Sequence, residues 1–238
     1  MTAPRASLPV RNVVAAPSEE AAGVVVLRSA LILALFAGIT RTVVDPDLWG
    51  HLRFGGDILA RGLPRLDPYS FTSDIPWVNH EWLAEVVMNL AWKAGGTAGL
   101  ILLKLAAAAI ALSFVALILT RDDDLHGIAR DLPCYAALIG MWQRVFVVRP
   151  QIFSVALFAT LLWILRSAER GRAARLWLLP AVFAVWVNLH GGWIVGLSVL
   201  AMWAVVEASP FRRFDIDGRV LVGAVIAAAL ATLVNPYG

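Results

Sequence analysis

The sequence predicts an all-α protein that crosses a membrane about seven times. Three observations indicate this fold class. Of the 238 residues, 60% are hydrophobic and only 16% are charged, and the mean hydropathy of +0.75 exceeds that of an ordinary soluble domain. The apolar residues form blocks, several of them long enough to cross a bilayer, which takes roughly 20 residues. The 10 Trp residues suit the interfacial belts of a membrane protein.

The chain begins with a polar segment and a first apolar block. Residues 1–22, rich in Ala, Pro, Ser and Val, predict a disordered cytoplasmic tail, and residues 23–42 predict the first span. A cleaved signal peptide is the alternative interpretation, but no clear small-residue cleavage site follows the apolar block, so we expect an uncleaved span. A hydrophilic region, residues 43–82, then forms the first loop. Residues 23–238 are expected to form one transmembrane domain.

Six further spans are expected after the first loop. Residues 83–94 have the pattern of an amphipathic helix, which leads through Gly95 and Gly96 into a second span at 97–120. The remaining apolar blocks are residues 132–148, 151–165, 176–189, 193–208 and 220–234.

The arginines predict the orientation of these spans. With a cytoplasmic N-terminus, the inner loops are residues 121–131, 166–175 and 209–219, which hold two, four and three Lys or Arg. The short outer hairpins near 149–150 and 190–192 hold Arg149 alone. Because positive residues accumulate on the cytoplasmic side, the first loop is expected to be extracytoplasmic. The motifs DPDLWGHLR, WVNHEW, QRVFVVRPQ, NLHGG and NPYG then fall on that outer side.

Two acids follow the first span. Asp45 and Asp47 flank Pro46, which breaks the helix and fixes a bent backbone. Asp47 could simply cap a helix that begins at Leu48. The functional alternative, which we favour for one of the two acids, is a carboxylate pair that binds a divalent cation such as Mg²⁺ or Mn²⁺, or acts as a general base.

The segment LWGHLRFGGDILARG predicts a helix lying in the membrane interface. Its role is expected to be structural, with His51 as the residue most suited to a functional role and Arg53 as a further candidate for substrate binding. Its apolar side chains should enter lipid and its charged side chains should face water, the two sets being Leu48, Leu52, Ile58 and Leu59, and Arg53, Asp57 and Arg61.

Other polar side chains at the outer side are candidates for substrate binding. Asn79, His80 and Glu81 could hold a sugar or a metal, or could cap the next helix. His190 lies at a span end, where a histidine is more often a hydrogen-bonded turn residue. Arg144 and Arg149 flank a hairpin. An arginine at a span either snorkels to the interface or binds an anion, and a lipid phosphate is its natural ligand.

The sequence lacks the motifs that are typical of several functional classes. It contains no P-loop, no dinucleotide fingerprint, no zinc-finger spacing and no nucleophile elbow. We expect no nucleic-acid partner. Because the chain contains no soluble nucleotide-binding domain, an activated donor should arrive through the membrane lipids.

The combination DPDLWGHLRFGG, PRLDPYSFT, WVNHEWLAE, RPQIFS, WVNLHGGW and NPYG resembles a bacterial group within the GT-C superfamily of integral-membrane glycosyltransferases. The resemblance covers residues 25–238. It implies a multi-pass protein of the bacterial cytoplasmic membrane that transfers a sugar from a polyprenyl-phosphate donor to an envelope glycan, lipid or protein acceptor. Members of the superfamily usually have more spans, so the resemblance also implies that these residues are either an N-terminal part of a longer enzyme, which we favour, or a minimal version that lacks part of the pocket.

The resemblance assigns roles to some residues. In GT-C enzymes an acidic residue of the first outer loop is the base or a metal-linked acid, which implies this role for Asp45 or Asp47. Arg144 and Arg149 match the basic residues that bind the lipid phosphate, by position and chemistry only. The alternative class is a transporter or flippase for a lipid-linked or anionic solute, which would also explain membrane arginines. A scaffold subunit of an envelope-polymer assembly is a third interpretation.

Overall fold

The computed structural model describes residues 19–41, 43, 45–71, 76–119 and 147–237. Every regular element in this part of the chain is helical, apart from an isolated bridge between Leu66 and Pro76. The all-α class predicted from the sequence is therefore confirmed for these residues. Two helices within them are long and apolar enough to cross a membrane, Trp82–Leu119 and Gln151–Glu169.

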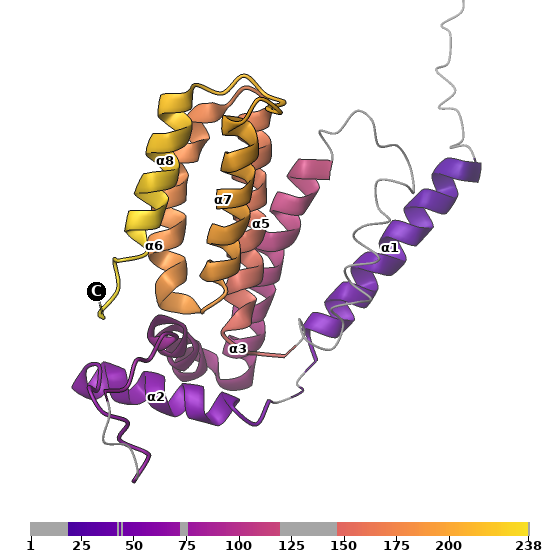
Figure 1. Cartoon of the computed structure of the whole chain (residues 1–238). Helices are drawn as coiled ribbons and strands as arrows, with labels where there is room; N and C mark the ends of the chain where they lie inside the picture. The colour runs from indigo at the N-terminus through magenta and orange to yellow at the C-terminus, as the bar shows by residue number, and fades with distance from the viewer. Residues whose placement is uncertain (1–18, 42, 44, 72–75, 120–146, 238) are drawn as a thin grey trace, which may run out of the picture.

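A bundle forms the body of the protein (Figure 1). It consists of the second half of α3 (Trp82–Leu119), α5 (Gln151–Glu169), the 3-10 helix η1 (Ala173–Leu178), α6 (Leu179–Leu189), α7 (Trp193–Ala208) and α8 (Gly218–Ala231). α1 (Glu19–Ile39) lies beside the bundle in Figure 1 and contacts α3. α2 (Leu48–Arg61) lies across one end of the bundle, here named the α2 end.

The predicted spans agree with the helices where the structure describes them. The span predicted at 193–208 coincides with α7, and the break predicted at Gly95 and Gly96 is present, since both residues leave helical geometry inside α3. α1 begins at Glu19, so the last residues of the predicted tail are helical. The span predicted at 132–148 falls almost wholly outside the described residues, and seven transmembrane helices remain a prediction.

α2 packs closely on the first half of α3. A Cβ atom on Gly55 would lie 2.0 Å from the backbone oxygen of Glu85, so only glycine allows this approach. The Asn89 side chain donates a hydrogen bond to the Leu52 carbonyl across the same contact, at 2.7 Å. The glycine that weakens α2 as a helix is thus required by its packing.

The apolar face of α2 corrects one expectation. Leu48 and Leu52 were expected to enter lipid, but both are buried against Met88, Leu100 and Val148. The reason is that α3 covers this face. An amphipathic pattern is the same whether its apolar side contacts lipid or another helix, so the sequence alone could not distinguish the two. Leu59 is exposed, as expected, and so are Arg53 and Arg61.

The bundle core is aromatic and closely packed. Trp186 of α6 is almost fully buried and stacks on Phe183, with the two planes 26° apart. A Cβ atom on Gly196 would lie 2.5 Å from the Trp186 ring, so α7 can reach α6 only because residue 196 is glycine. Outside this core, large apolar side chains are exposed along α1, α3, α7 and α8, such as Ile32, Leu102, Val205 and Ile226.

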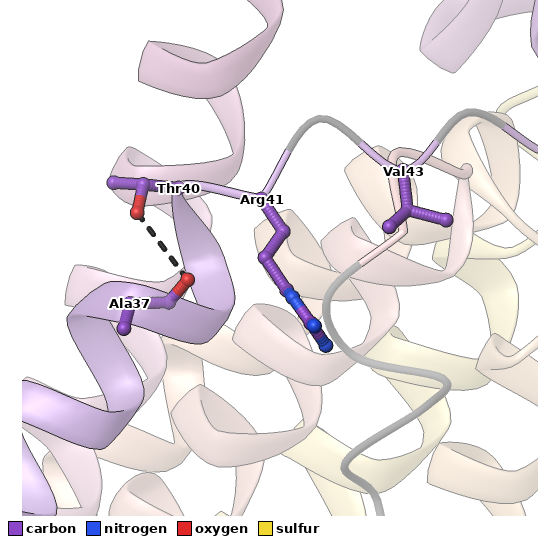
Figure 2. A pocket seen from close by; sticks show the side chains of 4 residues that line it. All are labelled: Ala37, Thr40, Arg41 and Val43. Atoms are coloured by element: carbon purple, nitrogen blue, oxygen red, sulfur yellow. Dashed lines mark hydrogen bonds between the residues drawn. The ribbon is translucent and has the colours of Figure 1, made fainter.

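A hollow of about 410 Å³ lies where the chain leaves α1. It is lined by Ala37, Thr40, Arg41 and Val43, and the Arg41 side chain extends beside it (Figure 2). The carbonyl of Arg41 accepts a hydrogen bond from the Lys104 ammonium of α3, at 3.0 Å. This contact connects the chain just after α1 to α3, four residues before Asp45.

Candidate functional site

A carboxylate–arginine unit, Asp45, Asp47 and Arg149, lies at the α2 end. The Nη2 group of Arg149 donates hydrogen bonds to Asp45 Oδ1 at 2.7 Å and to Asp47 Oδ2 at 2.6 Å. The Nε atom lies 2.7 Å from Asp45 Oδ2, a charge contact without hydrogen-bond geometry. The guanidinium thus joins two acids that follow α1 to the segment just before α5. The sequence analysis expected Arg149 and these acids on the same outer side, and in the structure they are in direct contact.

The two acids of this unit have different surroundings. The Asp45 side chain is 15% exposed and Asp47 is 65% exposed. Asp45 Oδ1 also accepts a hydrogen bond from the Asp47 backbone N–H. Burial opposes ionisation of Asp45, but the hydrogen bond and charge of Arg149 outweigh it and hold the pKa of Asp45 below its usual value. Asp47 occupies the position before α2, yet its side chain makes no capping hydrogen bond. The simple cap interpretation of Asp47 is therefore wrong.

The carboxylate–arginine unit offers two carboxylates to a divalent cation. Mg²⁺ and Mn²⁺ prefer oxygen ligands, and two carboxylates are a minimal set. Here the Arg149 guanidinium lies between those carboxylates, where a cation would have to bind. Within the described ranges, no group of three or more His, Cys, Asp or Glu side chains could hold a metal ion. The observed arrangement does not fit a resident cation, so no chemical step is assigned to one.

A second group, the histidine–glutamate cluster, consists of His51, His80, Glu81, Glu85 and His190. In its first part, His51 Nδ1 lies 3.2 Å from Glu85 Oε1. Burial alone would lower the pKa of His51, but the hydrogen bond and charge of Glu85 raise it above the usual value. The buried Asn79 side chain donates to the other oxygen of Glu85, which orients the carboxylate.

In its second part, Glu81 lies between two imidazole rings. Its Oε1 atom is 3.6 Å from His190 Nε2 and 3.7 Å from His80 Nε2. Burial raises the pKa of Glu81, with Glu85 adding to the effect. Burial lowers the pKa of His190, and the nearby His80 acts in the same direction. The site therefore holds a carboxyl group and a neutral imidazole whose pKa values have moved toward each other.

Hydrogen bonds connect several of the polar motifs at the α2 end. The Trp82 indole donates to Asn188 Oδ1 at 2.8 Å, and Asn188 in turn donates to the Val234 carbonyl. The Tyr237 hydroxyl accepts a hydrogen bond from the Asn79 backbone N–H at 3.0 Å. These contacts fix the end of the first loop, the start of α3, the end of α6 and the chain after α8 relative to one another.

The carboxylate–arginine unit and the histidine–glutamate cluster interact electrostatically. The charge of Arg149 acts on Glu81, and the charge of Asp47 acts on His51. His51 likewise contributes to the environment of Asp45. Because such effects fall off with distance, the two groups belong to one site.

One candidate for substrate binding, Arg53, lies away from this site. Arg53 is exposed and pairs with Asp57 at 2.8 Å, and the Tyr69 hydroxyl also contacts Asp57. These residues form a separate ion pair on the outer face of α2. Arg144 lies outside the described residues, so its predicted role in phosphate binding stays a prediction.

Sequence reasoning did not single out Glu85 or Ser154. Glu85 follows Glu81 by four residues, about one helical turn, so both side chains lie on the same face of a helix. This spacing could have identified Glu85 as a neighbour of Glu81. Ser154 belongs to the RPQIFS motif, and its hydroxyl lies 2.7 Å from His190 Nδ1. That contact joins residues 36 positions apart, so no local pattern could reveal it.

Comparisons with known proteins found no match that could inform the interpretation of this site. No family model matches the chain, and no curated protein or solved structure matches it.

The His51–Glu85 contact predicts a pH-dependent stability. Because the pKa of His51 is raised in the folded protein, the contact stabilises it fully below about pH 6.5, the unfolded value, and this contribution is lost as pH rises through the folded value. Melting in detergent should show this loss for the wild type and not for His51→Gln. Glu85→Gln, which removes the cause of the shift, should behave like His51→Gln. Parallel melting profiles for all three proteins would contradict the assignment.

Proposed function

We propose that the protein is a membrane glycosyltransferase of the GT-C type. It takes a sugar from a polyprenyl-phosphate donor and transfers it, with inversion, to an envelope glycan, lipid or protein acceptor on the extracytoplasmic face. The observation that carries the proposal is the meeting of Asp45, Asp47 and Arg149 at the exit of α1, beside Glu81 and His190. A lipid-borne donor presents its phosphate–sugar bond at this depth.

The membrane placement rests on the surface as well as on helix length. Besides the helices at Trp82–Leu119 and Gln151–Glu169, shorter apolar helices occur at Ala173–Leu189, Trp193–Ala208 and Gly218–Ala231. Large apolar side chains on these helices face outward, and exposed apolar area of this extent indicates contact with lipid. With the first helix and the apolar block at 132–148, we propose seven spans in the bacterial cytoplasmic membrane, with the N-terminus cytoplasmic.

At the donor side, Arg149 is the phosphate ligand. Its contacts with Asp45 and Asp47 engage Nε and Nη2, and Nη1 lies on the far side of the guanidinium. An arginine held by carboxylates keeps a fixed direction, and a fixed positive charge stabilises a departing phosphate without reorganisation. Asp45 and Asp47 are the acidic first-loop residues of this site, and they position the guanidinium against the leaving group.

The proposed sidedness gives a prediction for labelling. In a Cys134→Ser background, Phe71→Cys should react with a membrane-impermeant thiol reagent in intact cells, because residue 71 is fully exposed at the α2 end. Phe211→Cys, exposed at the opposite end, should react only after the cells are opened. The positive-inside distribution is the physical reason. The reverse pattern would invert the topology and place the site on the wrong side for a polyprenyl-phosphate donor.

The direct test of function is a transfer assay. Membranes that contain the full chain are incubated with polyprenyl-phosphate sugars and an envelope extract as acceptor, and labelled product is measured. Transfer that depends on the protein supports the proposal. Movement of the labelled lipid across the bilayer without any transfer would instead support the flippase alternative and overturn the glycosyltransferase.

A further inference from the structure

Glu81 and His190 face each other without a direct hydrogen bond, and both side chains are partly exposed, at 17% and 20%. The Oε1 atom of Glu81 lies 3.6 Å from His190 Nε2, which is too long for a hydrogen bond. Two polar atoms at this separation can be bridged by a hydroxyl oxygen that lies to one side of them and forms a hydrogen bond with each. A hydroxyl in this position would accept from one group and donate to the other, so the protonation of His190 decides what can bind.

The contacts of His190 Nδ1 fix its tautomer. The Gly192 backbone N–H donates to Nδ1 at 3.0 Å, and a backbone amide can only donate, so Nδ1 carries the lone pair. The Trp186 indole donates to Ser154 Oγ at 2.8 Å, which leaves the Ser154 hydroxyl hydrogen for Nδ1 at 2.7 Å. The proton of the neutral ring is therefore on Nε2, the nitrogen that faces Glu81.

The same contacts keep His190 neutral. A proton on Nδ1 would break the hydrogen bond from the Gly192 backbone N–H, which can only donate, and leave this amide without its acceptor. A Cβ atom on residue 192 would lie 2.5 Å from Ser154 Oγ, so glycine is required for this arrangement. Across the gap, Glu81 thus meets a ring that can donate a hydrogen bond to a hydroxyl oxygen but has no positive charge.

We propose that Glu81 and His190 bind the acceptor hydroxyl and that Glu81 is the general base of the transfer reaction, an inference that rests on the proposed function. His190 Nε2–H donates to the hydroxyl oxygen, and the hydroxyl donates to Glu81 Oε1. As the O–H bond breaks, its proton moves to Glu81 and its electron pair forms the new bond to the anomeric carbon. The bond from that carbon to the phosphate oxygen breaks, and its electrons leave with the lipid phosphate.

The surroundings favour Glu81 over the acids of the carboxylate–arginine unit as the base. A general base works best when its pKa lies near the working pH. Burial raises the pKa of Glu81, whereas the hydrogen bond from Arg149 keeps that of Asp45 low. His80 is 62% exposed and its Nε2 lies 3.7 Å from Glu81 Oε1, so it offers a path for the proton to solvent.

The kinetic test compares Glu81→Gln with Asp47→Asn in the transfer assay. Glu81→Gln should lower kcat by roughly a hundredfold or more, leave the KM for the donor near the wild-type value, and abolish the fall in rate at low pH. Asp47→Asn should retain that fall, because the base is intact. Detergent melting of each variant verifies folding. His190→Gln, at a positioning residue, should shift the pH profile while retaining a measurable rate.

The outcomes separate this inference from the proposed function. Absence of transfer by the wild type overturns the proposed function. Transfer by the wild type with an unchanged rate in Glu81→Gln, or loss of the low-pH fall in Asp47→Asn, overturns the assignment of the base alone.

A second measurement does not depend on activity. The ¹⁵N spectrum of histidine-labelled protein distinguishes the two neutral tautomers, and His190→Gln identifies the signals of that ring. We expect His190 protonated on Nε2, with Ser154→Ala shifting the Nδ1 signal and Glu81→Gln shifting the Nε2 signal. A ring protonated on Nδ1 would overturn the inference.

Discussion

Replacing Arg149 by Gln is expected to lower sugar transfer by roughly a hundredfold or more, the scale for removing a preorganised charge that stabilises a leaving group. The substitution removes the cation that contacts both Asp45 and Asp47. Because Asp45 is mostly buried, it would lose its ionic partner, so detergent melting should fall as well. Arg149→Lys should keep part of the activity, since an ammonium retains the charge but cannot reproduce the planar contacts with two carboxylates.

Arg53→Gln is the matched control for this prediction. Arg53 also pairs with an aspartate, Asp57 at 2.8 Å, but on the exposed face of α2. An exposed pair contributes little, so neither transfer nor melting should change measurably. If Arg53→Gln and Arg149→Gln reduced transfer equally, the effect would reflect loss of positive charge in general and not the position of Arg149. Full activity of Arg149→Gln would contradict the donor-phosphate role directly.

Replacing Gly55 by Ala is expected to destabilise the protein by about 3 kcal/mol, the upper range for overpacking. The new Cβ would lie 2.0 Å from the Glu85 backbone oxygen, and a backbone atom at a helix contact cannot move aside without separating α2 from α3. Separation would also displace His51 from Glu85, so the melting temperature and the pH dependence of stability should change together.

Gly50→Ala serves as the control on the same helix. Its Cβ would meet only the Phe54 ring, at 3.8 Å, an ordinary contact. Alanine is the better helix former by about 1 kcal/mol, so this variant should melt at the same temperature or higher. Equal destabilisation by both substitutions would contradict this prediction, because the loss could not then be attributed to the close packing at Gly55.

Much of the helical framework could be predicted from the sequence. The start of α2 at Leu48 follows from Pro46, which breaks the preceding geometry, and the bend in α3 follows from adjacent glycines. The expected gathering of polar motifs at one end also holds for the described residues, because apolar blocks connected by short loops place alternate turns at the same end. Apolar content and the spacing of helix breakers are local properties, so the sequence alone determined these features.

The partners of the polar side chains were decided only by the tertiary structure. Arg149 was expected on the same outer side as the acids, yet nothing in the sequence showed that one guanidinium would contact both Asp45 and Asp47. The lipid-facing assignment of Leu48 and Leu52 was wrong because the amphipathic pattern does not distinguish lipid from a neighbouring helix. The tautomer of His190 depends on Gly192 in the turn before α7 and on Ser154 of α5, which is 36 positions away in the chain. Hydrogen bonds between distant segments depend on the angle and separation of packed helices, and those follow from side-chain fit across the whole bundle.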